Sequence, residues 1–328
     1  MRITGARSAR YPIVLMNREK GDSSYDQTFT PEGIWKDKSG AGCTGKKWDN
    51  GYHDVRMIMQ TVGLHDRIEL YRTKEPGIRL ETNLFYLPNN EQNLAYRAAA
   101  LLIEEFGVKE GVSIQLKNVH SCIGRNGRRQ YRCSCGPFLG SIKMFWLGVL
   151  SIKELMERGV KLGADIPYCL MRGTALSEGI GEELTPLPQI PQCQVLIAKP
   201  GISVSTKVVY ESLDAMELKP EDHPDIDGMI EAINRQNIHE IAGKFGNVLE
   251  LVTAGKYPVI GEIEQVMKAE GAVNAMMSGS GPTVFGLFTN PQAAQNAYER
   301  LRYGDAAKLA KQVYLTNFFN VKRSTYKI

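Results

Sequence analysis

Residues 272–288 read AVNAMMSGSGPTVFGLF, and this stretch decides the fold. Two apolar runs, 272–277 and 283–288, flank a series of small and turn-forming residues, which is typical of two strands joined by a loop. A helical pattern over 292–301 and a strand pattern over 313–318 follow. Strands and helices that interleave in this way, without regular parallel repeats, predict an α+β fold with a split βαβ unit at the C-terminal end.

The chain upstream, from residue 51, carries the same two kinds of pattern. Helical spacing of apolar residues over 93–106 ends before Gly107, a common C-terminal stop. The segment 174–184 predicts a hairpin that turns at 179–181. The other expected strands are 55–61, 67–71, 112–116 and 195–199, and the other expected helices are 152–159, 225–234, 238–251 and 259–270.

Two stretches lack both the helical and the strand periodicity of apolar residues. Residues 1–50 are rich in Gly, Ser, Lys and Asp, and residues 118–142 are rich in Cys, Arg, Gly and Gln. These differences in periodicity and composition divide the chain into an irregular N-terminal segment (1–50), an N-terminal domain (51–185) and a C-terminal domain (186–328).

The composition is that of a globular protein, with 43% hydrophobic and 23% charged residues in 328 positions, enough for two domains that share a cleft. No run of about 18 apolar residues occurs, and the N-terminus lacks a signal-peptide pattern, so we expect a cytoplasmic protein without a membrane partner. The six cysteines are scattered and do not form a dense framework, which favours reduced thiols.

The net charge of +4 is unevenly distributed. Taken alone, the basic cluster within 118–142 suggests a nucleic-acid patch or a metal knuckle. No second ligand pair at metal spacing accompanies its Cys-x-Cys, which argues against the metal site. The cluster consists of Arg125, Arg128, Arg129, Arg132, Cys133 and Cys135.

Two short motifs carry candidate chemistry. The small residues of SGSGPT (278–283) let backbone amides approach a ligand, and its hydroxyls can donate to phosphate or substrate oxygens, although a lone Gly/Ser loop is more often a tight turn. LGADIP (162–167) places Asp165 between small and apolar neighbours, where a carboxylate can act as a general base. By itself, Asp165 is more typical of a helix cap.

Taken together and in order, the motifs resemble the GHMP kinase family. The resemblance covers 51–116 and 143–319, and it lies in the combination, since any one motif is weak. The motifs are GYHDVRMIMQT (51–61), NLAYRAA (93–99), LGADIP, SEGIGEEL (177–184), KPGISVST (199–206), NVLE (247–250) and MSGSGPTVFG (277–286). The resemblance implies an N-terminal domain like domain 2 of ribosomal protein S5 and a ferredoxin-like C-terminal domain.

The resemblance also implies an activity, the ATP-dependent phosphorylation of a small-molecule hydroxyl with Mg²⁺. Asp165 matches the family's catalytic aspartate, which takes the proton of the attacking hydroxyl. Within the family, the match is to the branch that acts on a cytidine diphosphate derivative in non-mevalonate isoprenoid biosynthesis. Tyr52 and His53 match the pair that holds the cytosine, by stacking and by hydrogen bonding, and Tyr210 is placed to close the other face of the base.

Further binding residues are implied by the same resemblance. The loop is expected to support the phosphate and sugar-alcohol end of the substrate. Asn93 lies in a segment that resembles one lining the nucleotide pocket. The loop residues concerned are Ser278, Gly279, Ser280, Gly281 and Thr283.

Two motifs of the family are missing, and both gaps fall in the aperiodic stretches. The family has an N-terminal strand of the form KINLxLxV, which carries a catalytic lysine, and a glycine-rich phosphate loop. With codons allowed by the written residues, 36–47 read one base later gives KINLGLDVLGK, and 122–138 gives ASAGMAGGSTDAAAVL. We therefore interpret both stretches as read out of frame, with most of the arginines in the basic cluster arising from glycine codons, and we expect the chain as written to be impaired as a kinase.

Three alternatives stay open at this point. A GHMP kinase of homoserine, mevalonate or a sugar would share the fold, although those substrates carry no cytosine. A remnant without catalytic activity would bind a cytidine nucleotide, or nothing, without turnover. A basic nucleic-acid binder would bind with a steep salt dependence. We expect a small-molecule substrate and no nucleic acid, and we leave a homodimer open.

Overall fold

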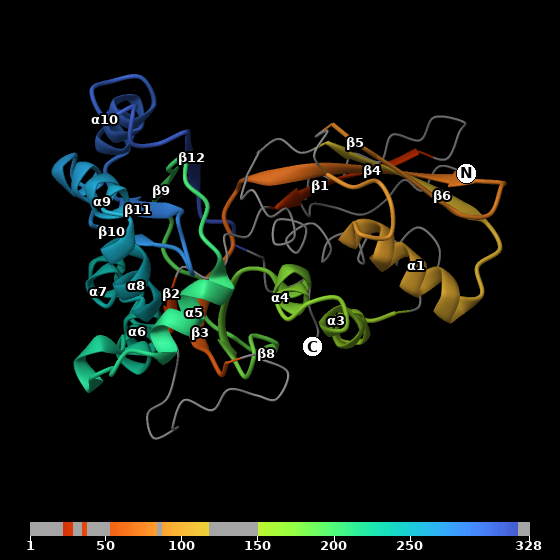
Figure 1. The fold of residues 1–328 in the computed structure, drawn as a ribbon, viewed down its shortest axis with the longest axis horizontal. Coiled ribbons are helices and arrows are strands. Elements are labelled where there is room, and N and C mark those ends of the chain that lie inside the picture. Colours follow the sequence, from red (N-terminus) through yellow and green to blue (C-terminus); the bar gives the residue numbers. More distant parts are fainter. Residues whose placement is uncertain (1–21, 29–34, 38–52, 84–86, 118–149, 321–328) are drawn as a thin grey trace.

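The computed structural model describes residues 22–28, 35–37, 53–83, 87–117 and 150–320. Figure 1 shows an N-terminal sheet at one end of the molecule and a C-terminal sheet surrounded by helices at the other. The proline-containing segment 187–193 joins the two halves of the chain between consecutive strands.

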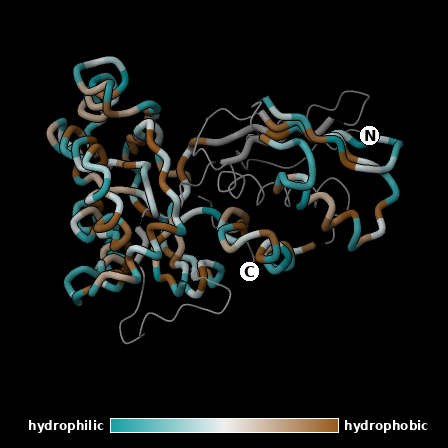
Figure 2. The backbone as a smooth tube through the Cα atoms, in the orientation of Figure 1, coloured by the Kyte–Doolittle hydropathy of each residue, from teal (hydrophilic) through white to brown (hydrophobic). Residues whose placement is uncertain are grey.

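The first sheet has the strand order β1-β4-β6-β5, from β1 (Asp22–Thr28), β4 (His65–Thr73), β5 (Ile78–Thr82) and β6 (Gly111–Lys117). β4 and β6 are antiparallel, whereas β5 runs parallel to β6. Alternation along β6 buries Val112, Ile114 and Leu116 on one face. Figure 2 shows the matching hydrophobic stretches along this sheet.

Helix α1 (Leu94–Phe106) packs its apolar stripe on this sheet. Asn93 caps its start, because the side-chain Oδ1 accepts from the backbone N–H of Ala95. Gly107 ends it in the left-handed conformation, at φ 59°, which glycine adopts without steric penalty. The expected helix over 93–106 and its stop at Gly107 are therefore confirmed.

The second sheet has the order β2-β3-β7-β8, from β2 (Trp35–Asp37), β3 (Arg56–Gln60), β7 (Thr174–Glu178) and β8 (Glu183–Pro186). β7 and β8 form the expected hairpin, with Gly179 and Gly181 at positive φ in its turn. The short helices α3 (Ile152–Val160) and α4 (Ile166–Met171) precede this hairpin in the chain.

Strands β1 and β2 differ from the expectation that 1–50 is irregular. Both are edge strands, and each pairs antiparallel with a strand of strong intrinsic pattern, β4 for β1 and β3 for β2. The partner's backbone groups impose the extended conformation, so no alternation of side chains is needed. The rest of 1–50 lies outside the described residues, as do all of 118–142 and Tyr52.

The C-terminal sheet is antiparallel, with the order β10-β11-β9-β12. Its strands are β9 (Gln194–Lys199), β10 (Asn274–Met277), β11 (Val284–Phe288) and β12 (Gln312–Asn317). In chain order the domain runs strand, helices, strand, strand, helix, strand, which is the ferredoxin-like arrangement expected from the sequence. Its helices are α5 (Thr206–Asp214), α6 (Ile226–Asn234), α7 (Ile238–Gly243), α8 (Val248–Lys256), α9 (Val259–Ala269) and α10 (Pro291–Arg302), with the 3-10 turn η2 (Pro220–Asp222).

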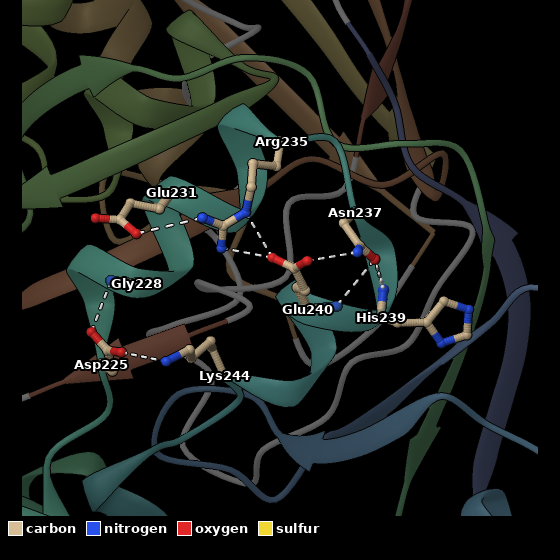
Figure 3. Close-up of polar contacts among 8 residues, drawn as sticks. All are labelled: Asp225, Gly228, Glu231, Arg235, Asn237, His239, Glu240 and Lys244. Atoms are coloured by element: carbon tan, nitrogen blue, oxygen red, sulfur yellow. Dashed lines mark hydrogen bonds and ion pairs between the residues drawn. The ribbon is translucent and has the colours of Figure 1, made fainter.

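The helix expected over 238–251 is instead two helices, α7 and α8. The chain leaves the helix after Gly243, and Asn247 restarts it by accepting from the N–H of Leu249. Polar contacts hold α7 against α6 (Figure 3). Lys244 bonds Asp225, the cap of α6, at 2.6 Å, and Arg235 at the end of α6 bonds Glu240 on α7.

The second sheet and the C-terminal domain share one hydrophobic cluster. It contains Ile58 and Leu176 from the second sheet and Met229, Phe285 and Phe318 from the C-terminal half. The last described residues return to the start of the fold, since Val62 pairs with Phe318 across an isolated antiparallel bridge.

Two further expectations are tested only in part. Among the described residues, Cys169 and Cys193 are buried cysteines that form no disulfide, and burial raises the pKa of Cys193 to about 12. Over the same part of the chain, no helix combines the length and the hydropathy that a membrane span requires.

Candidate active site

Asp165 occupies the position that precedes α4, and its side chain is 8% exposed. It does not cap the helix, because no side-chain capping bond forms. The carboxylate faces the β7–β8 turn, where a Cβ added at Gly181 would lie 3.9 Å from Asp165 Oδ1. The same added Cβ would lie 3.5 Å from Met57 Cε on β3. Asp165 is therefore a buried carboxylate close to Gly181 of the turn, with Met57 as an apolar neighbour of the same glycine.

The position of Asp165 is fixed by the anchoring of helix α4. Tyr168 on α4 is fully buried, and its hydroxyl donates to the carbonyl of Gly173 at 2.7 Å. The same hydroxyl lies 3.0 Å from Thr61 Oγ1, which in turn accepts from the N–H of Gly173. α4 is thereby bonded to the end of β3. Gly159 on α3 lets the two helices approach, since a Cβ there would be 2.6 Å from Ile166 Cγ2.

The SGSGPT loop connects β10 to β11, as expected, and the side chain of Asn247 is hydrogen-bonded to it. The Asn247 side-chain amide donates to the carbonyls of Met277, at 3.0 Å, and Gly279, at 2.8 Å. Its carbonyl oxygen meanwhile caps α8. One buried side chain therefore fixes both the loop and the start of a helix.

The loop itself needs its glycines. Gly279 and Gly281 have φ values of 56° and 76°, which residues with a Cβ adopt at a cost. A Cβ on Gly281 would also meet Met277 Sδ at 2.3 Å. Ser280 Oγ is hydrogen-bonded to Thr206 Oγ1 at the start of α5. The loop is a compact turn of small residues bonded to α5 and α8.

His53 and Tyr210 lie together, as the resemblance implied, but they contact one another directly. Their rings are stacked, with centroids 4.6 Å apart and planes inclined by 9°. His53 Nε2 lies 2.8 Å from Asp214 Oδ2, one helical turn beyond Tyr210 on α5. The roles expected for His53 and Tyr210 in base binding stay predictions.

Helix α5 connects these groups. Its start bonds the SGSGPT loop through Thr206, and its end bonds His53 through Asp214, a span of about 12 Å for nine residues. From His53 the chain continues to Val55, whose N–H donates to the carbonyl of Gly179 in the turn that Asp165 faces. Figure 1 shows α5 between α8 and α4. A series of bonded segments thus runs from the β7–β8 turn, which lies beside Asp165, through His53 and α5 to Ser280.

Two of the expected site residues stand apart from this series. Asn93 is 1% exposed, and both ends of its amide are bonded, because the oxygen caps α1 and the nitrogen donates to the carbonyl of Pro88 at 2.8 Å. Its expected place in the nucleotide pocket stays a prediction. Tyr52 lies outside the described residues.

Sequence reasoning missed three contributors, Asp214, Thr206 and the amide of Asn247. Asp214 lies 161 positions from His53, so no local pattern connects them. The Tyr-x-x-x-Asp spacing on one helix face was the available signal. Asn247 lay within a recognised motif, but only the fold brings its amide to residues 277 and 279.

The carboxyl groups of Glu250 on α8 and Glu264 on α9 lie next to one another. Burial, together with the nearby charge of Glu250, raises the pKa of Glu264 to about 8. Glu250 accepts from the N–H of Met277 at 3.0 Å, and burial raises its pKa as well. Lys268 stands 3.9 Å from Glu264. The pair lines a cavity of about 450 Å³ immediately behind β10.

Comparisons with known proteins agree with this geometry. The GHMP kinase C-terminal family matches residues 229–306. A 4-diphosphocytidyl-2-C-methyl-D-erythritol kinase of Lachnospira eligens is 49% identical over 271 residues, which cover 83% of this chain and 92% of the relative. The enzyme of the same name from Lachnoclostridium phytofermentans is 48% identical, over 84% of this chain and 92% of the relative.

Solved structures share the fold. A 4-(cytidine 5'-diphospho)-2C-methyl-D-erythritol kinase superposes with a TM-score of 0.69 at 24% identity, over 91% of this chain and all of the other. Homoserine kinase from Cytophaga hutchinsonii gives the same TM-score at 18% identity, over 92% of this chain and 96% of the other. The two-domain GHMP fold is therefore confirmed, and the identity to the curated relatives is decisive: the chain belongs to the 4-diphosphocytidyl-2-C-methyl-D-erythritol kinases of the GHMP family.

Proposed function

We propose that this fold catalyses the ATP-dependent phosphorylation of the 2-hydroxyl of 4-diphosphocytidyl-2-C-methyl-D-erythritol, a step of non-mevalonate isoprenoid biosynthesis. The observation that carries the proposal is the series of bonded segments from the β7–β8 turn beside Asp165 through His53 and α5 to the SGSGPT loop. It joins a buried carboxylate, an aromatic and imidazole pair and a small-residue loop within one family member. A cytidine diphosphate substrate has a hydroxyl, a base and phosphates for these three groups.

Asp165 is the proton acceptor of the reaction. As the hydroxyl oxygen bonds to the γ-phosphorus of ATP, the bond from that phosphorus to the bridging oxygen of ADP breaks, and the hydroxyl proton passes to the carboxylate. Gly181 adds no side chain to the space beside Asp165, where an added Cβ would lie 3.9 Å from Oδ1. Positioning of this kind supplies much of the catalysis in phosphoryl transfer.

ATP is the phosphate donor of the GHMP family, and Mg²⁺ would offset the charge of its phosphates. Within the described ranges, no cluster of three or more Asp, Glu, His or Cys side chains offers a protein-only metal cage. Mg²⁺ is usually held by one or two carboxylates together with substrate phosphates.

The chain as written is impaired in this reaction. Residues 36–47 and 122–138 stand where the family has its lysine strand and its phosphate loop, and the second stretch carries arginines and a glutamine in place of small residues. Bulky side chains prevent the backbone from wrapping the phosphates closely. Apart from Lys36 and Asp37 in β2, these positions lie outside the described residues, so the interpretation rests on the sequence.

The test compares the chain as written with a version in which both segments are rewritten one base later. Both are assayed for ATP-dependent phosphorylation of 4-diphosphocytidyl-2-C-methyl-D-erythritol, with homoserine and mevalonate as control substrates. We expect turnover of the cytidine substrate by the restored chain and no measurable turnover by the chain as written. Comparable turnover by both would show that the frame interpretation is wrong. Turnover of homoserine or mevalonate in preference would overturn the substrate assignment.

A further inference from the structure

We propose that Asp214 is a positioning residue that fixes the proton of His53 and thereby selects cytosine over uracil. The inference rests on the proposed function, because it concerns the base of that same substrate. It adds a residue, distant in sequence from the base-binding motif, and a physical basis for telling two pyrimidines apart.

The geometry holds the His53 ring from two directions. Tyr210 covers one face of the imidazole at 4.6 Å, and Asp214 bonds its edge at 2.8 Å. Tyr210 and Asp214 are four residues apart on α5, so they project from the same side of the helix. Since His53 is only 8% exposed, its orientation is set by these two contacts and by the strand that comes after it.

The carboxylate decides where the imidazole proton resides. An ionised Asp is an acceptor only, whereas a neutral imidazole has one N–H donor and one bare acceptor nitrogen. In the neutral form of His53, the nitrogen that faces Asp214, Nε2, therefore carries the hydrogen, and Nδ1 is left as an acceptor.

An acceptor at this position distinguishes the two pyrimidine bases. Cytosine carries an exocyclic amino group, which donates hydrogen bonds, at the ring position where uracil carries a carbonyl oxygen, which only accepts. A bare imidazole nitrogen attracts the amino group and faces the uracil carbonyl with two acceptors in opposition. Sites that hydrogen-bond a substrate group discriminate strongly against analogues that lack it, because the buried partner is left unpaired.

The experiment measures the binding of CDP and UDP to the full chain and to Asp214→Asn by isothermal titration. We expect the unmodified chain to bind CDP at least about 10-fold more tightly than UDP, the ratio that one net hydrogen bond supports. In Asp214→Asn, the amide offers a donor as well as an acceptor, so the His53 proton is no longer fixed and the CDP to UDP ratio falls toward one. Nitrogen NMR of His53 reports the proton position directly, with a single protonated nitrogen before the substitution and a mixture after it.

Glu211→Gln is the matched control, because Glu211 is a carboxylate on the same helix that pairs with Lys207 on the exposed side. It should retain the CDP preference, and thermal unfolding should show that both variants are folded. If Asp214→Asn keeps the ratio, or weakens CDP and UDP equally, Asp214 has only a structural role and the inference is overturned. If the unmodified chain itself does not prefer CDP, the cytidine assignment of the proposed function fails as well.

Discussion

Glu264 is the residue whose chemistry departs most from its sequence context, since nothing around it in the helix indicates a neutral carboxyl group. It lies on α9 with Glu250 as its neighbour, and one of its oxygens, Oε1, is buried without a hydrogen-bond partner. Burial and a like charge both disfavour ionisation. The folded protein therefore binds a proton here that the unfolded chain releases above its ordinary pKa of 4.5.

This proton makes stability depend on pH. Because the folded pKa of about 8 exceeds the unfolded value, the free energy of unfolding should fall as pH rises from about 5 to 8, by up to about 1.4 kcal/mol per pH unit. Glu264→Gln keeps the shape without the charge, so this decline should flatten and the variant should be the more stable protein at pH 8. Urea unfolding across this range measures it, with the exposed Glu262→Gln as control. Equal slopes for the two variants would contradict the assignment.

Asn247 provides a second test at this scale. Asn247→Ala removes a helix cap and two bonds to the SGSGPT loop, so it should destabilise the protein by about 2–4 kcal/mol and lower kcat in the frame-restored chain. Asn290→Ala removes only the cap of α10 and should cost about 1 kcal/mol with kcat unchanged. Measuring kcat and urea unfolding for both variants distinguishes the loss of a helix cap from the loss of the bonds to the loop. An equal loss in both variants would mean that the loop does not depend on Asn247.

At the scale of elements, prediction from sequence succeeded where local signals and packing agree. α1 has an apolar stripe, a capping Asn93 and a left-handed Gly107, so its type and its ends were both predicted. The prediction of one continuous helix over 238–251 was wrong, because the apolar spacing persists through the break before α8, the helix that Asn247 caps. β1 and β2 were missed, since their partners and not their own side chains make them strands.

The site shows the same division. His53, Tyr210 and the SGSGPT loop were picked out from recognised motifs, and their roles stay predictions, whereas Asp214 was not picked out, because only the path of α5 brings it to His53. Contacts between distant segments leave no periodic trace in a sequence.

The β10–β11 turn offers an element-level prediction. Gly281→Ala places a Cβ at positive φ and 2.3 Å from Met277 Sδ, so it should destabilise the protein by about 1–3 kcal/mol and reduce activity in the frame-restored chain. Gly261→Ala is the control, because that glycine lies within α9 with open space around it, and alanine there should stabilise by about 0.5–1 kcal/mol. Thermal unfolding measures both. A stabilising effect of Gly281→Ala would contradict the steric conflict expected for a side chain at this position.

At the scale of the whole molecule, the cluster shared between the second sheet and the C-terminal domain should make the described parts unfold together. Ile58 is fully buried in this cluster. Ile58→Ala should lower stability by about 2–5 kcal/mol while preserving one transition, seen identically by circular dichroism and tyrosine fluorescence. Ile114→Ala, in the separate core under α1, is the matched substitution. Two resolved transitions in either variant would show that the domains unfold independently.

The return of residues 317–319 to residues 61–63 has a consequence for how the protein is made. Gly63 donates to the carbonyl of Asn317, Phe319 donates to that of Thr61, and Gln60 reaches Phe319 across 259 positions. A ribosome delivers residues in order, so a link between the beginning and the end of the fold can close only after the last strand has emerged. During most of translation, Thr61, which follows β3, therefore lacks its bond to Phe319. The apolar residues next to it are meanwhile accessible to chaperones or to other nascent chains.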